Sequence, residues 1–180
     1  MTVFVAGIHG VGKTYLCESF SSRAAIPHRS ASALIKSQRQ RVDWGKDKLV
    51  SGIDENQQAL VTAVGECLSE NADLLLDGHF VLKDASGNFI KLAPSIFTSL
   101  AITAIVLIEH TPTVIASRLS ERDGTAHPGD ISGFLIAERE HSKLVSEALA
   151  CQHITLHAPS TDEFYNAVAP LFQGEPEDGT

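Results

Sequence analysis

The chain has 180 residues, a formal net charge of −8, 43% hydrophobic residues and 20% charged residues. This size and composition are typical of one soluble globular domain with a full core. The acidic balance argues against broad binding to nucleic acids or to anionic membranes, because both require positive protein surface.

The cysteines and the apolar runs argue against a disulfide-rich, zinc-binding or membrane-spanning protein. Cys17, Cys67 and Cys151 are far apart and lack C-x-x-C spacing, so we expect reduced thiols rather than a disulfide framework or a zinc site. No apolar run approaches the roughly 18 residues of a membrane span, and no signal peptide is visible. These absences predict a cytoplasmic protein.

The N-terminal segment carries the most specific motif. Thr2–Ala6 is predicted to be a buried strand and residues 13–24 a helix. Between them lies G-x-x-x-x-G-K-[ST], the phosphate-binding P-loop. The glycines let several backbone N–H groups point inward, and the helix N-terminus adds its positive end. We expect the whole loop to bind ATP; its residues are Gly7, Ile8, His9, Gly10, Val11, Gly12, Lys13 and Thr14.

The middle of the chain alternates between strand and helix patterns. A short strand is predicted at Pro27–Ser30 and a basic helix at Ser32–Arg41, followed by a loop over Val42–Ser51. Asp54 and Gln57 have the spacing of a capping box, which predicts a helix from there to about Glu70. Strands are predicted at Ala72–Asp77 and Thr103–Ile108. Between them we expect a hairpin, with strands Phe80–Lys83 and Phe89–Leu92, and a short helix, Pro94–Leu100.

The C-terminal part continues the alternation. Thr111 and Pro112 predict a helix start, Asp123–Asp130 a loop and Ile131–Ala150 a helix. A last strand, His153–His157, and a last helix, Thr161–Leu171, follow; residues 174–180 form an acidic tail that we expect to be disordered. The whole predicts an α/β fold: one three-layer α/β/α P-loop domain over residues 1–173, with a five-stranded parallel sheet.

Four side chains are candidates for catalysis. Lys13 is expected to reach the β- and γ-phosphates of ATP. Asp77 ends a buried strand, where a carboxylate could hold Mg²⁺ together with the Thr14 hydroxyl; its alternative is a turn or helix cap. Arg118 and Arg122 are one helical turn apart and would neutralise phosphate charge. Their alternative is a solvated basic face.

Other residues are weaker candidates, for binding the acceptor. Arg139 could reach the transferred phosphate, but Glu138 and Glu140 beside it make a surface salt bridge a rival. Ser32 and Arg39 could contact an acceptor or form a solvated helix face, and Gln57 could do so or cap its helix. His79 follows Asp77-Gly78 and could face the acceptor.

Three segments together resemble the P-loop nucleoside monophosphate kinases, especially archaeal-type adenylate kinases. They are GIHGVGKT, LLLDGHF and SRLSERD. In that family an R-x-x-x-R pair leads into a lid; here the pair is Arg118 and Arg122 and the lid about residues 123–130. Two departures stand out: His79-Phe80-Val81 replaces the bacterial F-P-R after D-G, and Gly124–Gly129 contains no arginine.

The expected function is therefore ATP- and Mg²⁺-dependent phosphoryl transfer to a small acceptor, with a nucleoside monophosphate as the leading candidate. A small-metabolite kinase is one alternative, since one scaffold serves many acceptors. The other is an ATPase or nucleotide-binding switch that acts with a protein partner, suggested by the arginine-poor lid. No membrane partner is expected.

Overall fold

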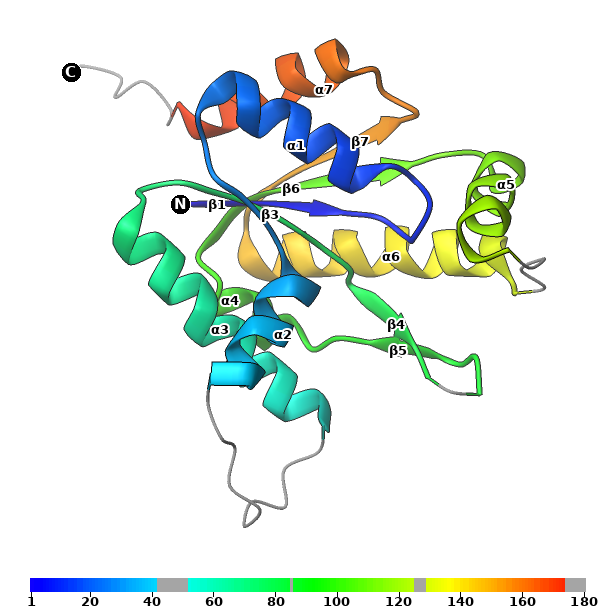
Figure 1. Ribbon diagram of the computed structural model, residues 1–180, viewed down its shortest axis with the longest axis horizontal. Coiled ribbons are helices and arrows are strands. Elements are labelled where there is room, and N and C mark those ends of the chain that lie inside the picture. Colours follow the sequence, from blue (N-terminus) through cyan, green and yellow to red (C-terminus); the bar gives the residue numbers. More distant parts are fainter. Residues whose placement is uncertain (42–51, 85, 125–128, 174–180) are drawn as a thin grey trace.

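The computed structural model describes residues 1–41, 52–84, 86–124 and 129–173. Five parallel strands form its central sheet in the order β2-β3-β1-β6-β7 (Figure 1). The strands are β1 Thr2–Ala6, β2 His28–Ser30, β3 Leu74–Gly78, β6 Ile102–Glu109 and β7 Gln152–His157. The central strand β1 and its neighbour β3 are buried at every position, which explains their near-continuous apolar sequences. The predicted five-stranded parallel sheet is confirmed.

Helices cover both faces of this sheet, so the predicted three-layer arrangement is confirmed as well (Figure 1). On one face lie α1 and α7, which contact each other; on the other lie α4 and α6. The helix α5 packs beside α6, and a short 3₁₀ helix, η1, follows α7. The bounds are α1 Lys13–Ala24, α4 Pro94–Thr98, α5 Pro112–Asp123, α6 Ile131–Leu149, α7 Thr161–Val168 and η1 Ala169–Phe172.

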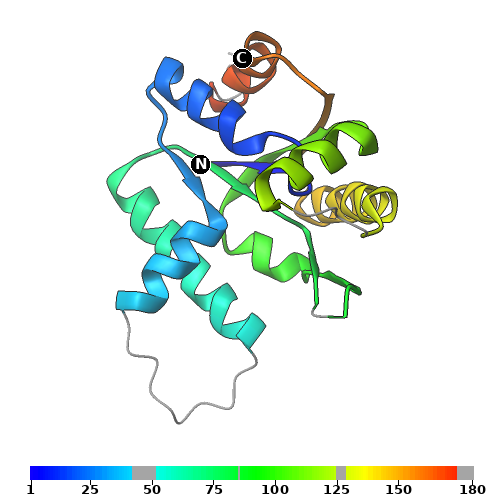
Figure 2. The same cartoon turned by 45° about the vertical axis from the view of Figure 1, so that its right-hand side comes forward.

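A helical pair projects from the sheet on the side of β2 (Figures 1 and 2). It consists of α2, Ala31–Arg41, and α3, Gly52–Glu70, which pack against each other. The predicted N-cap at Asp54 is wrong, because α3 begins two residues earlier and Asp54 lies in its first turn. The loop predicted over residues 42–51 lies outside the described residues, as do residues 125–128 of the predicted lid and the tail 174–180.

The predicted hairpin is present as a separate two-stranded sheet. Its strands, β4 Val81–Lys83 and β5 Phe89–Lys91, pair in antiparallel register. The Asp84 carboxylate closes the turn, since Oδ1 accepts hydrogen bonds from the backbone N–H groups of Ser86 and Asn88, each at 2.8 Å. The hairpin begins three residues after β3, so it lies beside the carboxyl end of that strand.

Three aromatic side chains occupy the core beneath the hairpin. The ring centroids of Phe4, Phe80 and Phe97 lie 4.7–5.6 Å apart in tilted or edge-to-face arrangements. All three are at most 2% exposed. Open parallel sheets bind ligands at the carboxyl ends of their strands, so this cluster supports the region where a site is expected.

No helix within the described residues is long and apolar enough to cross a bilayer.

Candidate active site

The loop between β1 and α1 has the backbone geometry of a phosphate cradle. Gly7, Gly10 and Gly12 have φ values of 144°, 87° and 103°, a region that other residues rarely adopt. A Cβ at Gly7 would also collide with the carbonyl oxygen of Ile108. The helix α1 begins at Lys13, directly after the loop, so its free N-terminal N–H groups face the same space. The backbone conformation of the loop therefore requires glycine at these positions.

Lys13 is folded inside this loop. Its side chain is 7% exposed, and Nζ donates hydrogen bonds to the carbonyl oxygens of Gly7 and Ile8, the latter at 3.3 Å. Burial lowers the pKa of Lys13, while the charges of Asp77 and Glu138 act to raise it. Phosphate oxygens would give the ammonium charged acceptors in place of neutral carbonyls, and such hydrogen bonds are stronger.

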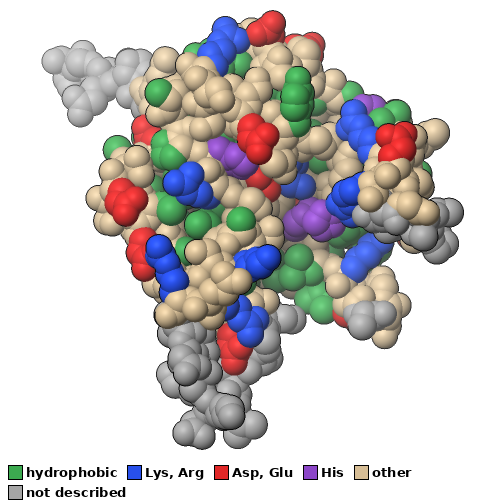
Figure 3. Space-filling model, in the orientation of Figure 1, with side chains coloured by type: hydrophobic (Ala, Val, Ile, Leu, Met, Phe, Trp, Pro, Cys, Tyr) green, Lys and Arg blue, Asp and Glu red, His purple; other side chains and the backbone are tan. Residues whose placement is uncertain are grey.

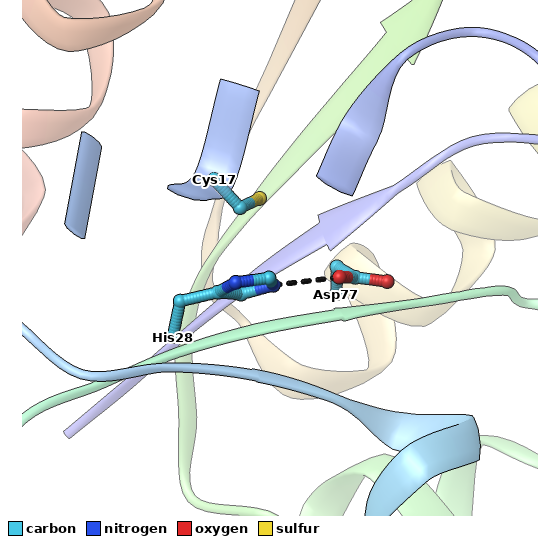
Figure 4. Close-up of side chains that lie close together, drawn as sticks. All are labelled: Cys17, His28 and Asp77. Carbon is cyan, nitrogen blue, oxygen red and sulfur yellow. Dashed lines mark hydrogen bonds and ion pairs between the residues drawn. The ribbon is translucent and has the colours of Figure 1, made fainter. Parts of the chain in front are cut away.

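Asp77 lies at the carboxyl end of β3, where its side chain is buried. The Oδ2 atom is 2.6 Å from Nε2 of His28, a residue of β2 that sequence reasoning had not singled out (Figure 4). Asp77 lines the same cavity as Lys13 and Thr14. A carboxylate and a hydroxyl facing one space are oxygen ligands of the kind that Mg²⁺ takes, so these two residues fit the metal that P-loop chemistry uses.

A cavity of about 340 Å³ opens beside the P-loop, between the carboxyl ends of the strands and the α2–α3 pair. We call it the acceptor cavity. Its polar wall includes five predicted acceptor or catalytic residues: Lys13, Ser32, Gln57, Asp77 and His79. Its apolar wall is formed by Phe4, Ile35, Leu60, Leu82, Leu92, Ile96 and Phe97. In Figure 3 histidine and basic side chains gather near the centre of the face that is shown.

The predicted arginine pair lies on the other side of the P-loop. Arg118 and Arg122 line a second hollow, of about 280 Å³, which shares His9, Lys13 and Thr14 with the acceptor cavity. Nη1 of Arg118 donates to the carbonyl oxygens of Gly10 and Val11, each at 3.1 Å. We call this 280 Å³ space beside Arg118 and Arg122 the phosphate hollow. The two spaces therefore meet at Lys13, and both arginines line the hollow beside the loop; their catalytic role stays a prediction.

A third hollow, of about 530 Å³, adjoins the phosphate hollow, with which it shares Gly12, Tyr15 and Arg118. It was not predicted from the sequence. Tyr15, His110 and Arg118 line it, together with residues 158–161, which follow β7. Tyr15 is 69% exposed although it is a large aromatic residue. Only weak evidence for this hollow is present in the sequence, because Ala158-Pro159-Ser160 indicates no more than a turn before a helix.

Two predicted acceptor residues do not line the acceptor cavity. Arg139 makes a bidentate ion pair with Glu109, with Nε–Oε1 and Nη2–Oε2 distances of 2.6 and 2.9 Å. This contact raises the pKa of Arg139. Arg39 donates to Asn56 Oδ1 at 2.7 Å and to Glu55 Oε2 at 3.2 Å. The acceptor roles of these two arginines stay predictions, and the geometry places neither with Lys13.

Comparison with known proteins agrees with this geometry. A family model described as an AAA domain matches residues 6–131, from the end of β1 to the start of α6. The chain belongs to this AAA domain family. No curated protein sequence matches the chain.

Solved structures similar to this AAA domain share its fold at low identity. A sugar kinase from Janibacter sp. HTCC2649 is 15% identical, with a TM-score of 0.57, covering 99% of this chain and 98% of that one. A putative kinase from Chloroflexus aurantiacus is also 15% identical, with a TM-score of 0.56 and coverages of 96% and 98%. A gluconokinase from Sinorhizobium meliloti is 17% identical, with a TM-score of 0.51 and coverages of 96% and 91%. These likenesses show a shared α/β fold; the narrower resemblance to archaeal-type adenylate kinases stays a prediction.

One buried carboxylate of the AAA domain interacts both with the P-loop and with the backbone at the start of the hairpin. Glu138, predicted as a possible surface partner of Arg139, is 1% exposed, so that interpretation is wrong. Its oxygens accept hydrogen bonds from the backbone N–H groups of Phe80, at 3.0 and 3.1 Å, and Val81, at 2.8 Å. Burial raises the pKa of Glu138 to about 6, against the opposing effect of these hydrogen bonds and of Lys13.

His79 lies next to this network and is held neutral. Burial, then the charges of Lys13 and His9, lower the pKa of His79 to about 2. Its ring centroid is 4.3 Å from that of His9 in the P-loop. A neutral imidazole at this point can donate or accept a hydrogen bond but adds no positive charge for an acceptor phosphate.

Glu138 predicts a specific pH dependence of stability. Its folded pKa of about 6 lies above the ordinary value of 4.5, so the fold favours the protonated acid. The stabilisation is complete below the unfolded pKa and is lost as the pH rises through the folded pKa; the loss is about 2 kcal/mol. Urea unfolding of the wild type and of Glu138→Gln, at about pH 4.5 and pH 7, should show the wild type losing this amount relative to the variant. A difference independent of pH would contradict the raised pKa, because other groups titrate alike in both proteins.

Proposed function

We propose that this AAA domain transfers the γ-phosphoryl group of ATP to a small molecule bound in the acceptor cavity. The meeting of two spaces at one lysine supports this proposal: the acceptor cavity and the phosphate hollow share His9, Lys13 and Thr14. Phosphoryl transfer depends mainly on placing the donor, the acceptor and compensating charge in line. An arrangement with the P-loop between two hollows would supply those positions.

The chain's own residues divide this work. The backbone N–H groups of residues 7–14 would surround the phosphates, and Lys13 would pair with the β- and γ-phosphates. Arg118 and Arg122 would neutralise charge from the phosphate hollow. Thr14 and Asp77 would hold Mg²⁺, which would offset negative charge on the phosphate oxygens. The hollow lined by Tyr15 and His110 would take the base of ATP.

The identity of the acceptor is the finer part of the proposal. The leading candidate is a nucleoside monophosphate, from the resemblance to archaeal-type adenylate kinases. An uncharged alcohol is the second candidate, and the composition of the cavity wall favours it. Among the described residues that line the acceptor cavity, seven are large and apolar, and Lys13 is the one lysine or arginine. Burying an acceptor phosphate there would need further compensating charge.

An acceptor panel tests the function. Purified protein is given ATP and Mg²⁺ with each of several nucleoside monophosphates, nucleosides and small polyols, and ADP release is measured with a coupled assay. ADP release that depends on one acceptor supports the kinase. Slow hydrolysis that no acceptor changes would instead support the nucleotide-binding switch. No ADP release and no ATP binding by a folded sample would overturn both.

A further inference from the structure

Three side chains with different metal-binding groups meet behind the P-loop. Cys17 of α1, His28 of β2 and Asp77 of β3 each place one ligand atom within 4.8 Å of the other two (Figure 4). Cys17 is fully buried, and the His28 and Asp77 side chains are 11% and 7% exposed. The thiol and the imidazole have no function in the phosphoryl transfer proposed above, in which Asp77 alone of the three takes part.

The fold fixes all three positions. The strands β2 and β3 are neighbours in the sheet, with Ser30 beside Asp77. Cys17 lies one helical turn after Lys13, so both point from the same face of α1 toward the sheet. The helix α1 contacts both strands. The cluster is therefore built from three adjacent elements of the core rather than from surface side chains.

The ligand chemistry selects a class of metal. A thiolate and an imidazole suit Zn²⁺ and similar borderline-soft ions, whereas Mg²⁺ takes oxygen ligands. We propose that Cys17 Sγ, His28 Nε2 and an Asp77 carboxylate oxygen bind one Zn²⁺-class ion. A fourth position would be left for water on the side of the acceptor cavity, which Asp77 lines.

Binding of the metal ion would also displace protons from its ligands. The Sγ–H bond of Cys17 is replaced by an Sγ–metal bond, and the thiol proton leaves to solvent. The 2.6 Å contact between His28 Nε2 and Asp77 Oδ2 holds a proton between the two atoms. For Nε2 to bind the metal, a neutral ring would shift its proton to Nδ1, whereas a doubly protonated ring would release its Nε2 proton to solvent and keep the one on Nδ1. Both atoms are then free to bind the metal.

The proposed consequence is inhibition, and it alone rests on the proposed function. Asp77 would serve both metals: Mg²⁺ together with Thr14, or the soft ion together with Cys17 and His28. An ion held by the cluster would draw the Asp77 carboxylate away from its place beside the phosphates. Zn²⁺ should therefore slow phosphoryl transfer at saturating Mg²⁺.

Cobalt gives a readout that does not depend on activity. Titrating Co²⁺ into the full chain should produce a thiolate-to-cobalt charge-transfer band that saturates at one ion per chain and disappears when Zn²⁺ is added. Cys17→Ser should weaken Co²⁺ binding by more than about 100-fold, since even outer-shell substitutions cost 10–100-fold. Cys67→Ser and Cys151→Ser are matched controls and should keep the band.

The outcomes separate the two proposals. A folded wild type without the band, or a band that persists in Cys17→Ser, overturns the metal site whatever the kinase assay shows. If Cys17→Ser fails to fold, His28→Gln provides a second test, since loss of the imidazole ligand should weaken Co²⁺ binding and shift the titration of the band to higher Co²⁺; an unchanged titration would overturn the site. A band with no ADP release under any acceptor leaves the metal site and removes the kinase. Where both exist, Zn²⁺ should inhibit the wild type and not Cys17→Ser.

Discussion

Replacing Lys13 with alanine is expected to lower phosphoryl transfer by about 10³-fold or more. Removing one preorganised hydrogen-bond donor from a developing anion typically costs 10²–10³, and a charged donor contributes more. Lys13 is the one cationic side chain among the three residues that the acceptor cavity and the phosphate hollow share, so its ammonium can follow the phosphoryl group between them. The measurement is ADP release at saturating ATP with the best acceptor from the panel.

Loss of structure is not expected to explain this result. Burial lowers the pKa of Lys13, so alanine at this position removes a charge whose desolvation opposes folding. Urea unfolding of Lys13→Ala should show one cooperative transition, which establishes that the variant is folded where its activity is measured. Lys143→Ala removes an exposed lysine from α6 and should change the rate less than about twofold. Wild-type turnover in Lys13→Ala would remove the P-loop mechanism.

Arg118→Ala is expected to reduce the maximal rate by about 10³-fold while weakening ATP binding much less. An arginine that stabilises charge in the transition state contributes 10³–10⁵ in rate in this class of chemistry. Arg118 also holds the P-loop, since Nη1 donates to the carbonyl oxygens of Gly10 and Val11. The measurement is kcat with the best acceptor, alongside ATP binding by calorimetry on the same preparation.

The charge-conserving variant separates the two roles of this arginine. Arg118→Lys keeps the positive charge but loses the planar fork of donors, so it should recover only part of the rate. Arg23→Ala serves as the control, because that arginine is exposed and makes a surface ion pair with Asp162. An Arg118→Ala variant that bound ATP more weakly but kept the wild-type kcat at saturating ATP would show that Arg118 acts on the ground state alone.

Local patterns in the sequence were enough for the phosphate side of the site. The P-loop depends on glycine conformations and a helix start within eight residues, and both can be read from the motif. The buried strands were also predictable, because β1, β3 and β6 are nearly uniform apolar runs between polar segments. The start of α3 was missed by three residues, since an N-cap at Asp54 places the first helical residue at 55, whereas the helix begins at Gly52, a residue of low helix propensity.

The long-range contacts could not be read in the same way. Glu138 was interpreted from its sequence neighbours, but its hydrogen-bond partners are Phe80 and Val81, nearly 60 residues away. The contact of His28 with Asp77 follows from the β2–β3 pairing, which no local pattern specifies. Arg139 likewise pairs with Glu109, 30 residues away, rather than with either adjacent glutamate.

The buried Glu138 carboxylate has a thermodynamic consequence for the two substrates. It binds the backbone at the start of the hairpin, beside His79 in the acceptor cavity wall, and interacts with both Gly7 and Lys13 of the P-loop. A shift of the loop on nucleotide binding would thus alter the opposite wall through one shared group. By linkage, each substrate would then change the dissociation constant of the other by an identical factor.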